Sequence, residues 1–120
     1  MKTTVAVIFS HAPYGNVIGE EGLNLAISLT SYIQKIGIFF LSDGIFQIYK
    51  KKITEKSYFS DYSHKFKMLF FLGVKNYYCE KSSLKNRGIL NLKNFFLKVK
   101  VLNTKKFMKK VNAFNHILTF

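Results

Sequence analysis

Residues 4–33 read TVAVIFSHAPYGNVIGEEGLNLAISLTSYI, with the pattern of a strand, a loop and a helix in succession. The run TVAVIF at 4–9 is apolar and β-branched, which predicts a strand buried on both faces. A loop at 10–19 holds the only proline, and Glu20 and Glu21 then suit the positive end of a helix dipole. The predicted buried face of this helix is Leu23, Ala26, Ile27, Thr30 and Ile33, with a second covered stripe at Leu25, Leu29 and Tyr32.

The same alternation continues through the rest of the chain. Further strands are predicted at 36–41, 74–79, 95–101 and 116–120. Further helices are predicted at 61–72, where Asp61 is taken as the start, at 80–87, and after a capping Thr104. Because strands and helices alternate without hairpin signals, the sequence predicts an α/β fold. We expect one domain over residues 1–120, with three α/β/α layers around a five-stranded, mainly parallel sheet.

Composition narrows the class of protein. Hydrophobic residues make up 48% and charged residues 21% of the 120 positions, which excludes a disordered chain. The single cysteine, Cys79, excludes an internal disulfide framework and a cysteine-rich zinc module. The longest apolar runs, 68–72 and 38–41, are far shorter than the roughly 20 residues that span a bilayer. The first nine residues offer an apolar run of only five residues, which is too short for a signal-peptide core. We therefore expect a cytoplasmic protein with no membrane association.

The formal net charge is +13, and 18 lysines stand against one arginine, Arg87. Such a charge suggests binding to phosphates. However, arginine is the better phosphate and base reader, and the lysines form only short clusters at 50–52, 105–106 and 109–110. The joint abundance of Asn, Ile, Phe, Tyr and Lys is typical of an AT-rich genome. We interpret the charge as compositional bias on a solvated surface, with binding as the alternative.

The loop after the first strand is the first candidate site. Its glycines are spaced G-x3-G-x2-G, which matches neither the dinucleotide fingerprint nor a phosphate loop. Glu20 and Glu21 would also repel a phosphate at the start of the helix. The sequence therefore favours a structural loop at an interface over a nucleotide site, and no cofactor is expected.

The titratable residues give few further candidates. His11, His64 and His116 show no metal-ligand spacing, so no metal is expected, and His64 is predicted to be solvated. Asp43 is predicted to cap a turn. Cys79 is the one weak catalytic candidate. A helix start after it would lower the thiol pKa, whereas packing as a small apolar side chain is the alternative. A Cys–His pair that meets only in the fold stays open.

The chain resembles a known family. VAVIFSHAPYG at 5–15, GEEGL at 19–23 and IFFLSDGIFQ at 38–47 resemble the TusC/DsrF family of sulfur-relay subunits. The most specific parts are the F-S-x-A-P-x-G loop and the F-F-x-x-D-G-x-F-Q stretch. Further similarity lies at 62–69, 77–79, 83–88 and 117–120, whereas 50–60 and 91–110 fit poorly by residue type.

The resemblance implies a DsrE-like fold and a place in a hexamer with sister subunits of B and D type, two copies of each. That complex passes persulfide sulfur to a downstream carrier of E type, toward 2-thiolation of wobble uridine in tRNA. Because the transferring cysteine is attributed to the D subunit, this chain is expected to be non-catalytic, with direct tRNA contact not expected. The alternatives are that Cys79 itself carries persulfide, as a sulfurtransferase, or that the lysines form a basic tRNA-contacting module.

Overall fold

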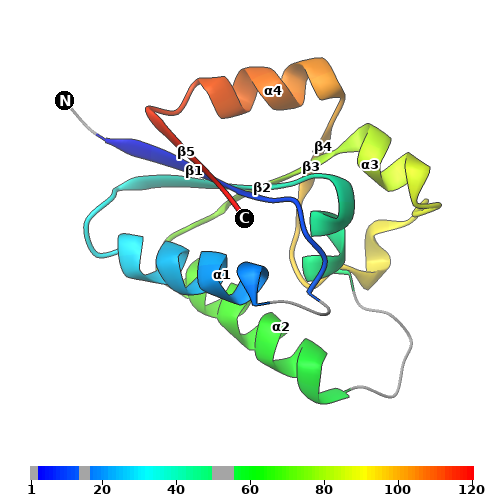
Figure 1. Cartoon of the computed structure of the whole chain (residues 1–120), viewed down its shortest axis with the longest axis horizontal. Helices are drawn as coiled ribbons and strands as arrows, with labels where there is room; N and C mark the ends of the chain where they lie inside the picture. The colour runs from blue at the N-terminus through cyan, green and yellow to red at the C-terminus, as the bar shows by residue number, and fades with distance from the viewer. Residues whose placement is uncertain (1–2, 14–16, 50–55) are drawn as a thin grey trace.

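The computed structural model describes residues 3–13, 17–49 and 56–120, with side chains from 64 onward in the last range, and shows a sheet between helices (Figure 1). The strands are β1 Thr4–Phe9, β2 Lys35–Phe40, β3 Asn76–Glu80, β4 Lys100–Leu102 and β5 His116–Thr119. The helices are α1 Ile18–Leu29, α2 Lys56–Phe71, α3 Lys81–Asn86 and α4 Thr104–Asn112, with 3-10 turns η1 Ser42–Gln47 and η2 Leu92–Asn94.

The strands form one five-stranded sheet in the order β4-β3-β2-β1-β5, and all neighbours pair in parallel. Strands β1 and β2, both inside the sheet, are apolar along almost their whole length, as strands covered on both faces are. In β1 and β2, every residue after the first is buried. The predicted α/β class with a five-stranded parallel sheet is confirmed.

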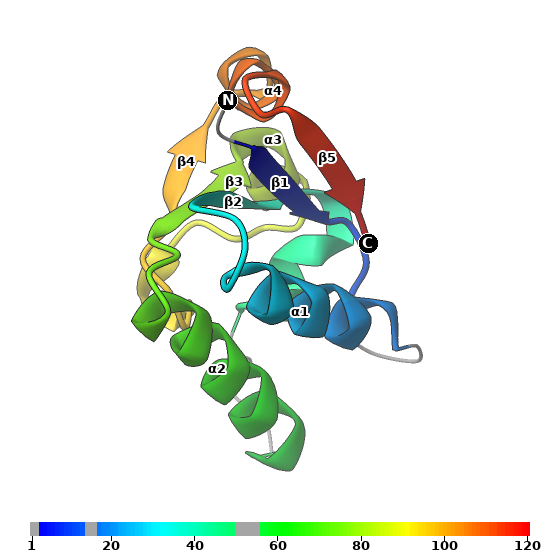
Figure 2. The ribbon, with the colours of Figure 1, turned by 90° about the vertical axis from the view of Figure 1, so that its left-hand side faces the viewer.

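Three layers result from this arrangement. Helix α4 covers one face of the sheet, and α1 and α2 cover the other (Figure 2). Beneath α4, Phe107 and Val111 pack on the sheet residues Ala6, Phe39 and Tyr78. The core on the opposite face is larger, and its centre is the aromatic group Phe9, Phe40 and Phe66.

The fourth strand was predicted at 95–101, but β4 is limited to Lys100–Leu102. The backbone of 95–96 pairs elsewhere: Phe96 donates its N–H to the carbonyl of Ile48, and Phe95 forms an isolated antiparallel bridge with Tyr49. Because residues 95–96 pair with the segment after η1, they do not extend β4 at the edge of the sheet. Their apolar alternation reflects packing against that segment.

Three predictions about helices were wrong in detail. The cap of α4 is Asn103, whose side chain accepts the N–H of Lys106 at 2.8 Å, and Thr104 is the first helical residue. Helix α2 begins at Lys56, so Asp61 lies inside it and does not start it. The second stripe is covered only at Leu29, because Leu25 is exposed and Tyr32, beyond the end of α1, is 84% exposed. Among the described residues, no helix is both long and apolar enough to cross a membrane.

Candidate functional site

Most of the recognisable sequence motifs meet at the carboxyl edge of the sheet, where β1, β2 and β3 end. The loop after β1, the turn η1 after β2 and the helix α3 after β3 lie together there (Figure 1). Loops at this edge are the usual ligand-binding position in parallel α/β folds. We call the group formed by Phe9, His11, Gly44, Gln47 and Ser83 the edge junction.

Gly44 allows the backbone of η1 to approach the backbone of Phe9 very closely. A Cβ atom on Gly44 would lie 1.7 Å from the carbonyl oxygen of Phe9, which no real contact permits. That same carbonyl accepts the N–H of Leu41 at 3.1 Å. The glycine of the D-G-x-F-Q stretch is therefore required by backbone packing between η1 and the end of β1, and not by chemistry on a substrate.

The buried side chain of Gln47 also connects η1 to the loop after β1. Its side chain is fully buried, and its Nε2 donates to the carbonyl of His11 at 2.9 Å. Gly19 on α1 makes room for it, because a Cβ there would lie 2.2 Å from Nε2. The Oε1 atom has no hydrogen-bond partner within the described part of the chain. Gln47 thus ties η1 to the loop after β1 and to the start of α1.

A polar network joins η1 to α3. Ser42 adopts a φ of 52°, and its N–H donates to Ser83 Oγ at 2.9 Å, while that hydroxyl donates to Glu80 Oε1. Asp43 was predicted to cap a turn, but the cap residue of η1 is Leu41, and Asp43 makes no side-chain capping bond within the described part of the chain. Its carboxylate accepts from Arg87 Nε at 3.0 Å and from the terminal guanidinium at 2.9 Å. Each acidic group of this network has a partner within the fold, so the network is a structural brace.

Cys79 lies in β3, next to Phe40 of β2 and Val101 of β4. Its side chain is fully buried within the larger core. Burial raises the pKa of the Cys79 thiol to about 12, because the apolar surroundings disfavour the thiolate. A persulfide carrier needs an accessible thiolate. The packing alternative therefore describes this cysteine better than an activated nucleophile does.

The histidines do not assemble into a site. His11, His64 and His116 are all exposed, which confirms the solvated position predicted for His64. Ser10 Oγ lies 3.3 Å from His11 Nδ1, and its hydroxyl also donates to the carbonyl of Phe120 at 3.1 Å. No group of three or more His, Cys, Asp and Glu side chains that could hold a metal exists among the described residues. The loop predicted as an interface lies partly outside the described residues, at 14–16.

Sequence reasoning missed the residues that hold the edge junction together. Gln47 stood at the end of a quoted motif, and Ser83 and Arg87 stood in another, but nothing in their spacing showed that they meet. The contacts join positions 36 to 44 residues apart. One signal was present in the sequence: Gly44, Gln47 and Ser83 are small or polar residues in otherwise apolar surroundings.

Comparisons with known proteins agree with this architecture. The chain is 40% identical to Protein TusC of Buchnera aphidicola subsp. Schizaphis graminum (strain Sg) over 116 residues, which is 97% of this chain and 98% of that protein. It is 37% identical, over the same shares, to Protein TusC of Buchnera aphidicola subsp. Acyrthosiphon pisum (strain Tuc7).

The solved structure of the ychN protein from E. coli shares the fold. It superposes with a TM-score of 0.77 at 23% identity, and the match covers 100% of both chains. The resemblance to the TusC/DsrF family is thus confirmed by relatives named TusC. The family model described as DsrE/DsrF-like matches residues 3–120, and the chain belongs to that family.

Proposed function

We propose that this chain is a non-catalytic subunit of a sulfur-relay complex that passes persulfide sulfur toward 2-thiolation of wobble uridine in tRNA. The similarity to proteins named TusC over 97% of the chain supports the sulfur-relay role. The observation that carries the non-catalytic role is the burial of Cys79. The only cysteine of the chain is fully buried, and its raised pKa disfavours the thiolate that must attack a persulfide.

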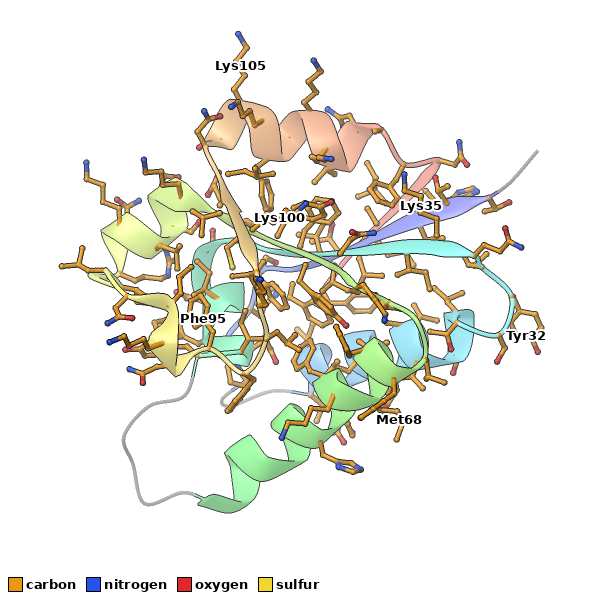
Figure 3. The ribbon with its side chains drawn as sticks, turned by 180° about the vertical axis from the view of Figure 1, so that it is seen from behind. Tyr32, Lys35, Met68, Phe95, Lys100 and Lys105 are labelled. Atoms are coloured by element: carbon orange, nitrogen blue, oxygen red, sulfur yellow. The ribbon has the colours of Figure 1, made fainter. Side chains whose placement is uncertain are left out.

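The proposal includes the assembly implied by the family resemblance. Sister subunits of B and D type would join this chain in a cytoplasmic hexamer with two copies of each subunit, which would deliver sulfur to a carrier of E type. In that assembly, residues 1–120 act as one domain. Exposed apolar side chains that lie together favour such partners, since monomeric proteins rarely expose large contiguous apolar patches. Several large exposed apolar side chains lie at or close to the C-terminal ends of α1 and α2: Tyr32, Met68, Phe70, Phe71 and Leu72. Figure 3 labels Tyr32 and Met68.

The first experiment measures 2-thiouridine in tRNA from cells whose only copy of this chain carries Cys79→Ser. We expect thiolation close to the unsubstituted level, with the assembled complex intact by mass measurement after co-expression of the three subunits. Cys79→Ala is the second variant, because it introduces no buried hydroxyl that would need a hydrogen-bond partner. Lost thiolation in both variants, with the complex still assembled, would make Cys79 a carrier and overturn the non-catalytic role.

Assembly itself needs a separate control, so that a failure of folding is not taken for a failure of sulfur transfer. The variant Phe71→Ser changes a side chain that is 86% exposed and leaves the core untouched. If the apolar ends of α1 and α2 bind a sister subunit, this variant remains folded alone but is recovered with less of its partners. Unchanged recovery would place the subunit contacts elsewhere on the chain.

A further inference from the structure

Charge is distributed very unevenly along this chain. Residues 81–120 carry nine lysines, Arg87 and no aspartate or glutamate, so this third of the chain holds +10 of the net +13. Four of these lysines fall within residues 105–110, on α4. Lys105, Lys106, Lys109 and Lys110 are all exposed, and Lys105 points away from the body of the protein in Figure 3.

The lysines of α4 have no anionic partner within the described part of the chain, where the ion pairs are Lys65–Glu20 and Arg87–Asp43. Lysines four apart on a helix, such as Lys105 and Lys109, repel each other. Two lysines in the first turn also oppose the helix dipole. An anionic partner on α4 would therefore be attracted to the lysines. It would also reduce the repulsion among these lysines that is present in the free chain.

A shallow groove lies beside these lysines, where α4 faces the edge strand β4. Its volume is about 320 Å³. We call it the lysine groove, and its lining is Leu102, Lys106, Lys109, Lys110 and Ala113. Lysine stems are apolar and only their tips are charged, so the groove combines an apolar floor with a cationic rim. That is the arrangement of a protein-binding patch, with apolar contact at the centre and charge around it.

We propose that the lysine groove binds an acidic, amphipathic segment of a partner protein, with a leucine-like side chain on Leu102 and Ala113 and carboxylates on the lysines. Two features favour protein over RNA. Single-stranded RNA is bound by stacking on exposed aromatic rings, and none of the described residues that line the groove is aromatic. Phosphate recognition also favours the planar fork of arginine, and every cation of the groove is a lysine. This surface is separate from the edge junction, and the proposal does not depend on sulfur transfer.

The test uses the full chain and a fluorescent twelve-residue helical peptide of glutamate and leucine in amphipathic order. Binding is followed by fluorescence anisotropy at two salt concentrations. A peptide with glutamine in place of glutamate tests the need for charge, and a mixture of yeast tRNA is the nucleic-acid probe. We expect the acidic peptide to bind, more weakly at higher salt, and the glutamine peptide to bind at least tenfold more weakly.

Three variants separate the lysine groove from general attraction. Replacing Lys106, Lys109 and Lys110 together by glutamine should weaken peptide binding at least tenfold. The matched control replaces three exposed lysines elsewhere, Lys67, Lys81 and Lys93, by glutamine, and should change binding less than threefold. Ala113→Gln narrows the groove without changing charge and should weaken the peptide about threefold.

Two results would overturn the proposal. One is equal loss of peptide binding in the two triple variants, which would mean that only net charge matters. The other is binding of tRNA, but not of the peptide, that is lost specifically when the groove lysines are replaced. That result would identify the lysine groove as a nucleic-acid surface.

Discussion

The edge junction and helix α4 differ in whether the charged side chains there are paired within the fold. In the edge junction, backbone groups approach so closely that Gly44 has no room for a Cβ, and Asp43 and Glu80 both have partners. On α4, four exposed lysines have no ion pair within the described residues. In the first region, the two carboxylates are paired within the fold. In the second, the lysines are not paired within the described residues, and such a surface is better explained by something that the chain binds.

The largest expected effect tests the close contact of the edge junction. Gly44→Ala places a methyl group where the Phe9 carbonyl now lies, so backbone must move. We expect a loss of about 3 kcal/mol or more in the free energy of unfolding, measured with urea. Gly73→Ala is the control: its φ is +101°, but no atom lies within 4 Å of the added Cβ, so only backbone strain of about 1–2 kcal/mol is expected. Similar losses in both variants would mean that the contact with Phe9 relaxes easily.

This contrast also marks what could be predicted from the sequence. β1 and β2 were predictable because a strand buried on both faces appears in the sequence as a short, continuous apolar run. The alternation of strands and helices then gave the fold class and the five strands. The close approach of Gly44 to Phe9 was not predictable, since the two positions are 35 residues apart and a glycine alone does not name its neighbour. The resemblance to a family identified the motif before any contact explained it.

The failures have physical causes as well. The segment 95–99 has the alternation of an edge strand, but its first residues pair with the chain after η1. For Cys79, sequence position alone left two opposite effects open: a helix start that lowers a thiol pKa, and burial that raises it. Only the packing decides between them, and full burial raises the pKa. The lysine clusters at 105–106 and 109–110 were visible in the sequence, but it did not show that these lysines lack an ion pair within the described residues.

A smaller effect concerns two buried groups of β3, Tyr77 and Cys79, and it depends on pH. Burial raises the pKa of Cys79 from 9.0 to about 12 and also raises the pKa of Tyr77 above 10.0. Above pH 9, the unfolded chain therefore loses protons that the folded chain retains, so the free energy of unfolding falls as pH rises. The Tyr77 hydroxyl is also buried with no hydrogen-bond partner among the described residues.

Tyr77→Phe removes both the unpaired hydroxyl and one of the two titrating groups. We expect a gain of about 1 kcal/mol at pH 7 and a shallower decline above pH 10, measured by urea unfolding between pH 7 and 11. The matched control is Tyr32→Phe, because Tyr32 is 84% exposed and should leave the curve unchanged. A loss of stability at pH 7 would show that the Tyr77 hydroxyl has a partner in solution.

The smallest effect has the opposite sign from that of Gly44 and tests α4 directly. Lys105→Glu puts a carboxylate in the first turn of α4, where it interacts favourably with the helix dipole and with Lys109 four residues later. We expect this substitution to stabilise the chain by about 0.5–1 kcal/mol, measured by thermal and urea unfolding. Lys109→Glu makes the same change of charge in the last turn, where the dipole disfavours it, so its gain should be smaller or absent. Equal gains in stability would show that the repulsion comes from the net charge of the whole chain. A gain confined to Lys105→Glu would show that the charges of α4 itself destabilise the free chain, as expected of a surface that binds an acidic partner.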